Sequence, residues 1–118
     1  MQSNPLYYKS DQLAHLVYKF TRDFSKEEVY GITSQLRRAV LSVPLNIVEG
    51  YARQSSRSFK QFLQIAYGSL KETKYLLHFC SDEGYLNKKD YNDALTLAEE
   101  IGKILWVLMN KVKEKANI

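Results

Sequence analysis

The spacing of apolar residues along the chain predicts an all-helical fold. In four segments the apolar positions recur at steps of three and four residues, which places them on one side of an α-helix. No segment is predicted to be a strand. The expected helices cover about residues 11–24, 26–53, 57–82 and 88–115. Because the connections are short, neighbouring helices are expected to be antiparallel, and the chain is expected to be one domain, 1–118, with an up-down four-helix bundle.

Residues suited to helix ends stand near the predicted boundaries. Ser25 and Glu28 have the spacing of a capping box, in which each side chain bonds to the other residue's backbone N–H. Gly84 follows the third helix, where a residue with left-handed backbone angles commonly ends a helix. The other expected N-caps are Ser10, Ser55 or Ser56, and Asn87.

The second predicted helix is apolar on two sides. Its inner stripe contains Val29, Ile32, Leu36, Val40, Val43 and Ile47. Leu41, Leu45 and Val48 lie on another side, and a chain of 118 residues is too short to cover them with a second core. We therefore expect these three residues to form an interface with another copy of the chain. Alternatively, Leu41 and Val48 widen the contact with neighbouring helices.

Two further features of the second helix are a proline and a polar stripe. Pro44 removes one backbone donor, so we expect a kink there, or else two shorter helices that meet at Pro44. The stripe contains Arg38, Asn46, Glu49 and Arg53, and Glu49 is placed to pair with Arg53 one turn away. It is interpreted either as a structural polar network or as a stripe from which Arg38 or its neighbour Arg37 contacts a ligand.

Basic and aromatic side chains gather on one side of the third predicted helix, away from its inner stripe. Lysines neutralise phosphates, and tyrosines can stack on exposed bases. This side is therefore the candidate nucleic-acid surface. The alternative is a solvated helix face whose tyrosines cover apolar surface. The candidate residues are Arg57, Lys60, Tyr67, Lys71 and Lys74.

Gly68 and Ser69 stand in the middle of the same helix. A glycine inside a helix costs about 1 kcal/mol relative to alanine, and close approach of another helix would offset that cost. We therefore expect both residues to be packing contacts. A phosphate-binding loop is not expected here, because no strand precedes them.

Charge and cysteine content narrow the classes of function. The net charge is +4, and residues 35–74 carry seven basic residues against two acidic ones, whereas the rest of the chain sums to −1. A local basic excess favours an anionic partner. Cys80 is the single cysteine, which excludes an intrachain disulfide and fits a reducing cytoplasm. No secretory signal and no membrane span are expected.

No combination of residues typical of catalysis is evident. The chain contains none of the motifs CxxC, HExxH and GxxxxGK[ST], and it lacks the ExxH motif of di-iron bundles. The two histidines, His15 and His78, lie on different predicted helices. We expect no enzyme activity, no cofactor and no metal.

Three motifs, LRRA, NIxEG and IAxGSL, follow one another in this order along the chain. They lie in a set of segments, Val29–Gly31, Gln35–Ala39, Ser42–Gly50, Phe59–Leu70 and Gly84–Leu86. In these segments the chain resembles a bacterial family known as the four helix bundle proteins, or the 23S ribosomal RNA intervening-sequence protein family, and the resemblance covers roughly residues 10–112. The order of the three motifs makes the resemblance specific.

The resemblance implies more about fold than about function. Family members are antiparallel four-helix bundles and are similar to proteins that form ring-shaped homopentamers. Some are encoded inside intervening sequences of 23S ribosomal RNA genes. Relatives include the accessory variability proteins of diversity-generating retroelements, which bind a reverse transcriptase and nucleic acid. The implied partners are copies of the chain itself, RNA or DNA, and a reverse transcriptase or other protein.

Together, the residues and the resemblance predict a non-enzymatic, oligomeric nucleic-acid-binding or accessory protein of the cytoplasm. The alternative is a homo-oligomeric protein-interaction scaffold without intrinsic affinity for nucleic acid. The two differ in whether the basic side of the third helix contacts phosphates or a protein.

Overall fold

In the described part of the chain, four long helices form an elongated molecule of 50 × 23 × 23 Å. A computed structural model describes residues 3–116, with Val29 and residues 113–116 described by their backbone alone. No strand occurs among the described residues, which confirms the all-helical prediction. The helices are α1 (Pro5–Thr21), α2 (Ser34–Tyr51), α3 (Ser56–Asp82) and α4 (Lys88–Ala116).

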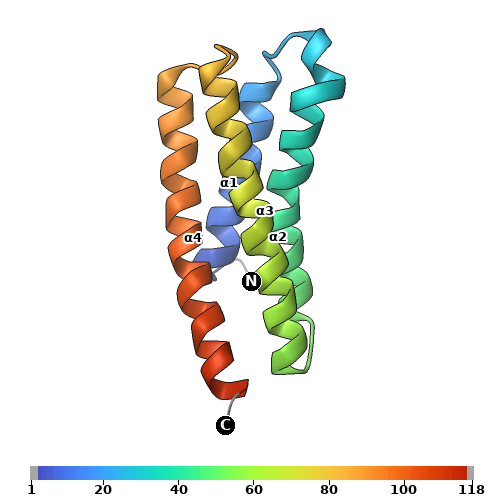
Figure 1. The fold of residues 1–118 in the computed structure, drawn as a ribbon, viewed down its shortest axis with the longest axis vertical. Coiled ribbons are helices and arrows are strands. Elements are labelled where there is room, and N and C mark those ends of the chain that lie inside the picture. Colours follow the sequence, from blue (N-terminus) through green and yellow to red (C-terminus); the bar gives the residue numbers. More distant parts are fainter. Residues whose placement is uncertain (1–2, 117–118) are drawn as a thin grey trace.

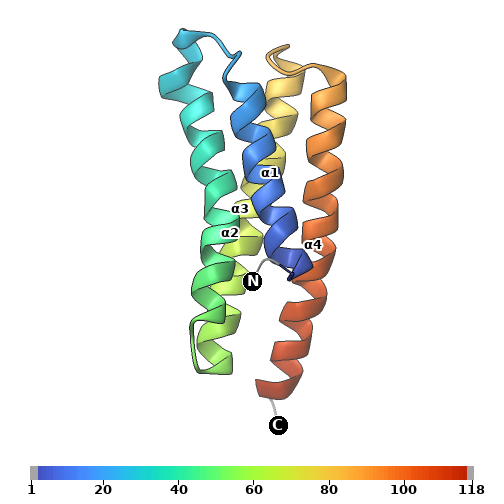
Figure 2. The same cartoon turned by 180° about the vertical axis from the view of Figure 1, so that it is seen from behind.

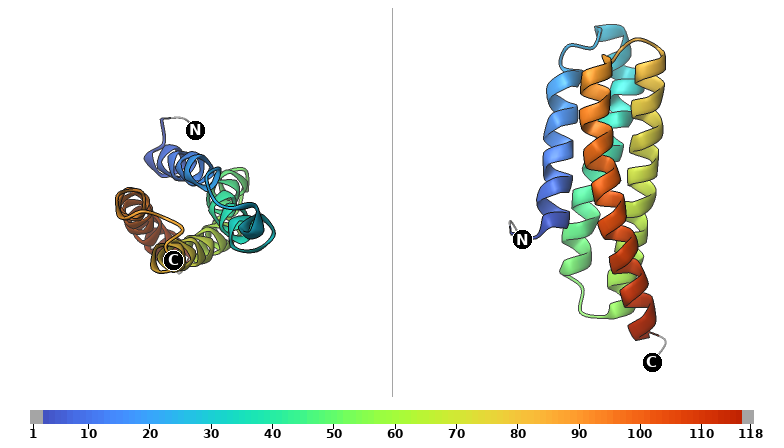
Figure 3. Two further views of the ribbon diagram at one scale, coloured as in Figure 1. Left: turned by 90° about the horizontal axis from the view of Figure 1, so that it is seen from above. Right: turned by 90° about the vertical axis from the view of Figure 1, so that its left-hand side faces the viewer.

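The helices stand at the corners of a square when the molecule is seen from above (Figure 3). Each helix contacts the next one along the chain, and α4 also contacts α1, which closes the bundle. The colours of Figure 1 show α1 and α3 running toward the same end of the molecule, while α2 and α4 return from it. Seen from behind, α1 lies between α2 and α4 (Figure 2).

One apolar core lies between the four helices. Four residues of the inner stripe predicted for the second helix are buried there, Leu36, Val40, Val43 and Ile47, and Ile32 packs against them. The side chain of Val29 lies outside the described part of the chain. Removing this surface from water is the main stabilising contribution, at about 25 cal/mol per Å². The largest fully buried side chains are Leu6, Leu13, Leu36, Ile47, Leu63, Leu70, Leu77, Ile101 and Leu105.

The first helix begins and ends earlier than predicted, at Pro5 and Thr21 instead of about residues 11 and 24. Asn4 is the N-cap, because its Oδ1 accepts from the backbone N–H of Leu6 at 2.9 Å. Proline is favoured at the first helical position, where no intrahelical donor is needed. Ser10, the expected cap, is buried inside the helix and donates to the carbonyl of Leu6 at 2.7 Å.

The segment predicted as one helix over 26–53 is divided before α2. A 3₁₀ turn (Lys26–Glu28) and a π-helical stretch (Val29–Thr33) precede it. No side-chain capping bond forms at Glu28, whose carboxylate accepts instead from the Tyr85 hydroxyl at 3.1 Å. Ser25 and Glu28 are joined by a backbone bond instead, from the N–H of Glu28 to the carbonyl of Ser25 at 3.0 Å, and the side-chain bonds of the expected capping box are not seen among the described residues.

The division of this segment falls at Gly31, where the backbone angles are non-helical (φ −108°, ψ −107°). The helix α2 continues through Pro44. The alternative of two shorter helices that meet at Pro44 is therefore wrong.

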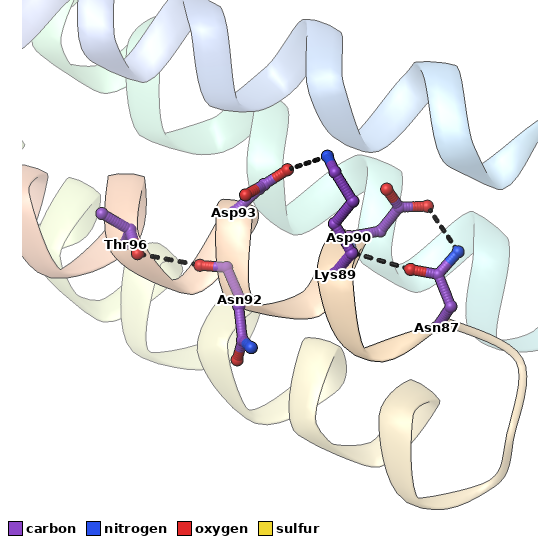
Figure 4. Close-up of polar contacts among 6 residues, drawn as sticks. All are labelled: Asn87, Lys89, Asp90, Asn92, Asp93 and Thr96. Atoms are coloured by element: carbon purple, nitrogen blue, oxygen red, sulfur yellow. Dashed lines mark hydrogen bonds and ion pairs between the residues drawn. The ribbon is translucent and has the colours of Figure 1, made fainter.

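The ends of α3 and α4 follow local sequence signals. Ser55 caps α3 by accepting from the backbone N–H of Ser58 at 3.1 Å. Gly84 has φ of +79°, and the N–H groups of Gly84 and Tyr85 bond back to the last turn of α3, as in a Schellman motif. Asn87 accepts from the backbone N–H of Asp90 at 2.8 Å and so caps α4 (Figure 4).

The helices have unequal lengths, with 17 residues in α1 and 29 in α4. Figure 3 shows α4 continuing past the level at which α1 begins. The last turns of α4 therefore lack α1 as a neighbour, and the side chains of Val107 and Lys111 near this end are exposed, whereas Val112 remains buried.

Candidate nucleic-acid interface

The five candidate residues of the third helix lie in one row on α3. Arg57 and Lys71 are exposed, whereas Lys60, Tyr67 and Lys74 are half-buried. Successive members are three, four or seven residues apart, so they share one side of the helix. At 1.5 Å per residue the row is about 26 Å long. This row, from Arg57 to Lys74, is called the α3 basic row below.

Two hollows lie along the α3 basic row. The first has a volume of about 420 Å³ and is lined by Arg57, Lys60, Gln61 and Gln64. The second, about 400 Å³, lies between α3 and α4 and is called the α3–α4 groove. The structure therefore separates the candidate residues into two groups, with Tyr67, Lys71 and Lys74 in the groove. The α4 residues that line the groove are Glu99, Gly102, Lys103, Trp106 and Val107.

Sequence reasoning missed the residues that α4 contributes to the groove, above all Trp106 and Lys103. The Trp106 side chain is 55% exposed, although tryptophan carries a large apolar surface. Its ring packs against Tyr67 with 5.9 Å between centroids. The ammonium of Lys71 lies 5.2 Å from the centroid of the Tyr67 ring. Tyr67 is thus contacted by both neighbours, and Trp106 presents the more exposed aromatic ring.

The electrostatics of the α3–α4 groove are dominated by lysines. Lys74 pairs with Glu99 at 3.1 Å, so that one cation is neutralised within the groove. Among the described residues Lys71 and Lys103 form no ion pair and keep their positive charge available. The groove therefore combines an aromatic surface with a net positive charge.

The polar stripe of α2 divides into separate contacts. Ser42 bonds to Ser69 of α3 at 2.7 Å, and the Asn46 amide donates to the Ser42 hydroxyl at 2.9 Å. Farther along α2, Arg53 pairs with Glu49 at 3.2 Å. Ser69 is thus a packing contact, as predicted. The same prediction is wrong for Gly68 within this chain, because Gly68 is exposed and no packed neighbour lies within 4 Å of the position that a Cβ would take.

The two neighbouring arginines of α2 have different surroundings. Arg37 donates to the hydroxyl of Thr21 at 2.9 Å and lies 4.5 Å from the centroid of the Tyr18 ring, so it contacts α1. Arg38 is exposed and makes no hydrogen bond to another described residue.

The outer face of α2 is apolar and open to solvent. Leu41, Leu45 and Val48 are 37%, 60% and 43% exposed, so these three side chains are not part of the buried core of this chain. A row of aliphatic side chains along one exposed helix face is typical of a surface that another molecule covers.

Groups with catalytic potential are few and dispersed. Among the side chains that the structure describes, those of residues 3–28 and 30–112, no three His, Cys, Asp or Glu come close enough to hold a metal ion. His15 and His78 each lie beside an aspartate one turn away, at 3.5 and 3.1 Å. Burial, with a smaller effect of Glu28, raises the pKa of the Cys80 thiol to about 11, so this thiol stays protonated at neutral pH.

The sequence of the chain matches the model of a known protein family. The model of the 23S rRNA-intervening sequence protein family matches residues 2–107. The chain belongs to this family. No curated protein matches the sequence, and none of the described helices is long and apolar enough to cross a membrane.

A solved structure shares the fold of this family member. It is a protein of unknown function from the S23 ribosomal protein family of Bacteroides thetaiotaomicron, with 26% sequence identity and a TM-score of 0.80. The match covers 88% of this chain and 97% of the other. Similarity over nearly the whole length of both chains places the four helices in the same arrangement.

Proposed function

We propose that this family member is a non-enzymatic, cytoplasmic protein that assembles into oligomers and binds nucleic acid through the α3 basic row and the α3–α4 groove. The observation that carries the proposal is the gathering of Lys71, Lys103 and two aromatic rings in one groove. Arg57 and Lys60 continue the positive charge along α3. Phosphates attract such a surface, and aromatic rings contact bases.

Binding through phosphates depends on salt in a defined way. Each neutralised phosphate releases counterions, so the logarithm of the affinity falls linearly with the logarithm of salt concentration, by about 0.7–0.9 per contact. Fluorescence anisotropy of a labelled structured RNA and a DNA duplex across a salt series measures this slope. We expect a negative slope equivalent to several contacts.

A charge-matched pair of variants tests the surface. The first changes Arg57, Lys60 and Lys71 to Glu, which leaves the Lys74–Glu99 ion pair intact. The second, with Lys19, Lys26 and Lys88 changed to Glu, has the same net charge and alters exposed residues outside the row. We expect the first variant to lose most of its affinity and the second to keep most of it. Equal losses would assign the binding to net charge and contradict the proposed surface.

Self-association is proposed through Leu41, Leu45 and Val48. Burying these side chains against a second copy would remove their apolar surface from water, which favours assembly by about 25 cal/mol per Å². Because the family resemblance implies ring-shaped homopentamers, the proposed oligomer is a ring of five subunits. Leu45→Glu, at the most exposed position of the three, is expected to give folded monomers by light scattering.

The control for that experiment is Val107→Glu. Val107 is exposed to a similar degree, 53%, but lies on α4. If Leu45→Glu leaves the molar mass unchanged, the outer face of α2 is not the interface.

The second candidate function is a homo-oligomeric scaffold that binds a protein, such as a reverse transcriptase. A mostly apolar groove of about 480 Å³ favours the scaffold function, because apolar surface suits a protein partner. The residues that line this groove include Pro5, Leu6, Tyr51, Ile104 and Leu108. The salt series separates the two functions. A scaffold of this kind shows no nucleic-acid affinity near physiological salt, and its protein partner remains bound when salt is raised.

A further inference from the structure

We propose that the α3–α4 groove takes an unpaired stretch of nucleic acid, with one base stacked on Trp106 and the flanking phosphates held by Lys71 and Lys103. This inference rests on the proposed nucleic-acid function and adds the form of nucleic acid and the residues that recognise it. Trp106 and Lys103 come from α4, so the site depends on both helices.

Trp106 has the position and support needed for a stacking platform, that is, an aromatic ring on which a base stacks. More than half of its side chain is in contact with solvent, and Val107 beside it is 53% exposed. Tyr67 packs against the indole from α3, with 43° between the ring planes, and limits the orientations available to it. An aromatic ring that is held in place loses little further freedom when a base stacks on it, which favours binding.

The charges beside Trp106 match a phosphate backbone. Lys71 and Lys103 line the groove from opposite helices, while the one carboxylate of the lining, Glu99, is occupied by Lys74. The Lys71 ammonium lies 5.2 Å from the centroid of the Tyr67 ring, which packs against Trp106, so a base stacked on the indole would bring its own phosphates near this charge. Proteins bind single strands by combining a positively charged groove with aromatic side chains on which bases stack, and the α3–α4 groove has both.

The groove favours an unpaired strand over a duplex. In a duplex both faces of each base are covered by neighbouring base pairs, so an indole can stack only at an end or after a base has been displaced. Bases in loops and single strands expose their faces without that cost. A peptide partner would use the apolar surface of Trp106 but would leave the two lysines to acidic side chains.

The fluorescence of the protein reports directly on this site, because Trp106 is the single tryptophan of the chain. We suggest titrating the full chain with oligouridylate of about 12 nucleotides, a length within the usual range for single-strand sites. The controls are a duplex of equal length and inorganic polyphosphate, which has the charge but no bases. Quenching by the single strand, with little effect of polyphosphate, is the expected result.

Substitutions at the platform complete the test, with binding measured by anisotropy of labelled oligouridylate. We expect Trp106→Ala to weaken binding about 5- to 150-fold, the range for loss of one base–aromatic stack. Trp106→Phe should recover much of the affinity. Tyr30→Ala is the matched control, since Tyr30 is an aromatic residue with 94% exposure that lies before α2, outside the groove.

The outcomes separate the platform from the proposed function. If oligouridylate binds with a negative salt slope but neither quenches Trp106 nor responds to Trp106→Ala, the protein binds nucleic acid and the platform is wrong. Equal quenching by the duplex, or by polyphosphate, also overturns the platform. If no nucleic acid binds at all, both proposals fail. Circular dichroism of each variant verifies that the helices are retained.

Discussion

The two sides of α3 differ in the size of the side chains that meet its neighbouring helices. Toward α2, small residues allow close contact: Ser42 bonds to Ser69, and a Cβ on Gly50 would lie 3.2 Å from atoms of Phe59 and Phe62. Toward α4, Tyr67 and Trp106 face each other near the surface, and a groove remains beside them. The same helix thus forms a closed contact on one side and an open, charged groove on the other.

The largest expected effect comes from filling the closed contact. Gly50→Leu inserts four carbon atoms where a single Cβ already meets Phe59 and Phe62 at 3.2 Å. Overpacking of this kind should lower the free energy of unfolding by about 3 kcal/mol, the upper part of the usual range, measured by urea denaturation. Gly68→Leu is the control, because nothing lies within 4 Å of a Cβ there. Similar losses for both would mean that the contact at Gly50 can open.

A pH-dependent loss of stability should follow from the buried thiol of Cys80. Burial raises the pKa of this thiol to about 11, whereas the pKa of a thiol in the unfolded chain is about 8.5. Above that lower pKa the unfolded chain loses a proton that the folded chain keeps, so stability falls as pH rises toward 11. The decrease should reach at most about 3 kcal/mol.

Cys80→Ala supplies the reference for that experiment. The difference between the two unfolding free energies should shrink as pH rises from neutral values toward the raised pKa of the thiol. A pH-independent difference would show that the thiol titrates normally in the folded chain.

A smaller effect is expected where α2 and α3 share a hydroxyl contact. Ser69→Ala removes the bond to Ser42, and the free energy of unfolding should fall by about 1 kcal/mol. The Thr96 hydroxyl bonds to the backbone of its own helix at an exposed site, so Thr96→Ala should cost nothing measurable. A neutral Ser69→Ala would indicate that close packing, without the hydrogen bond, holds the two helices together.

The smallest expected change is a gain in stability. Gly68 lies in the middle of α3 on its solvent-exposed side, and no packed neighbour lies within 4 Å of the position that a Cβ would take. Gly68→Ala should therefore raise the free energy of unfolding by up to about 1 kcal/mol, the helix-propensity difference. If the variant gains stability but its molar mass in light scattering falls, Gly68 lies under another copy of the chain.

The sequence predicted those features that depend on neighbouring residues. Ser55, Gly84 and Asn87 act within one or two turns, and each end that they mark lies within a residue of the predicted position. The start of α1 differs from the prediction because two sites have the chemistry of a helix start, Ser10 and Asn4 followed by Pro5, and the chain uses the second.

Features that depend on distant residues escaped prediction. Glu28 bonds to Tyr85, 57 positions away, so its local capping motif does not form. The exposure of Trp106 depends on how α3 and α4 pack, and its contact with Tyr67 joins two helices. Spacing along one helix predicted the α3 basic row, but half of the groove comes from α4.

The unequal lengths of α1 and α4 give the bundle a gradient of local stability along its axis. Where α1 runs beside α4, opening the helix backbone would require several buried side chains to separate at once. In the last turns of α4, beyond the level of Pro5, fewer neighbours hold the backbone amides. Amide hydrogens there should exchange with deuterium through local opening, well before those near Ile101, which exchange when the whole bundle unfolds.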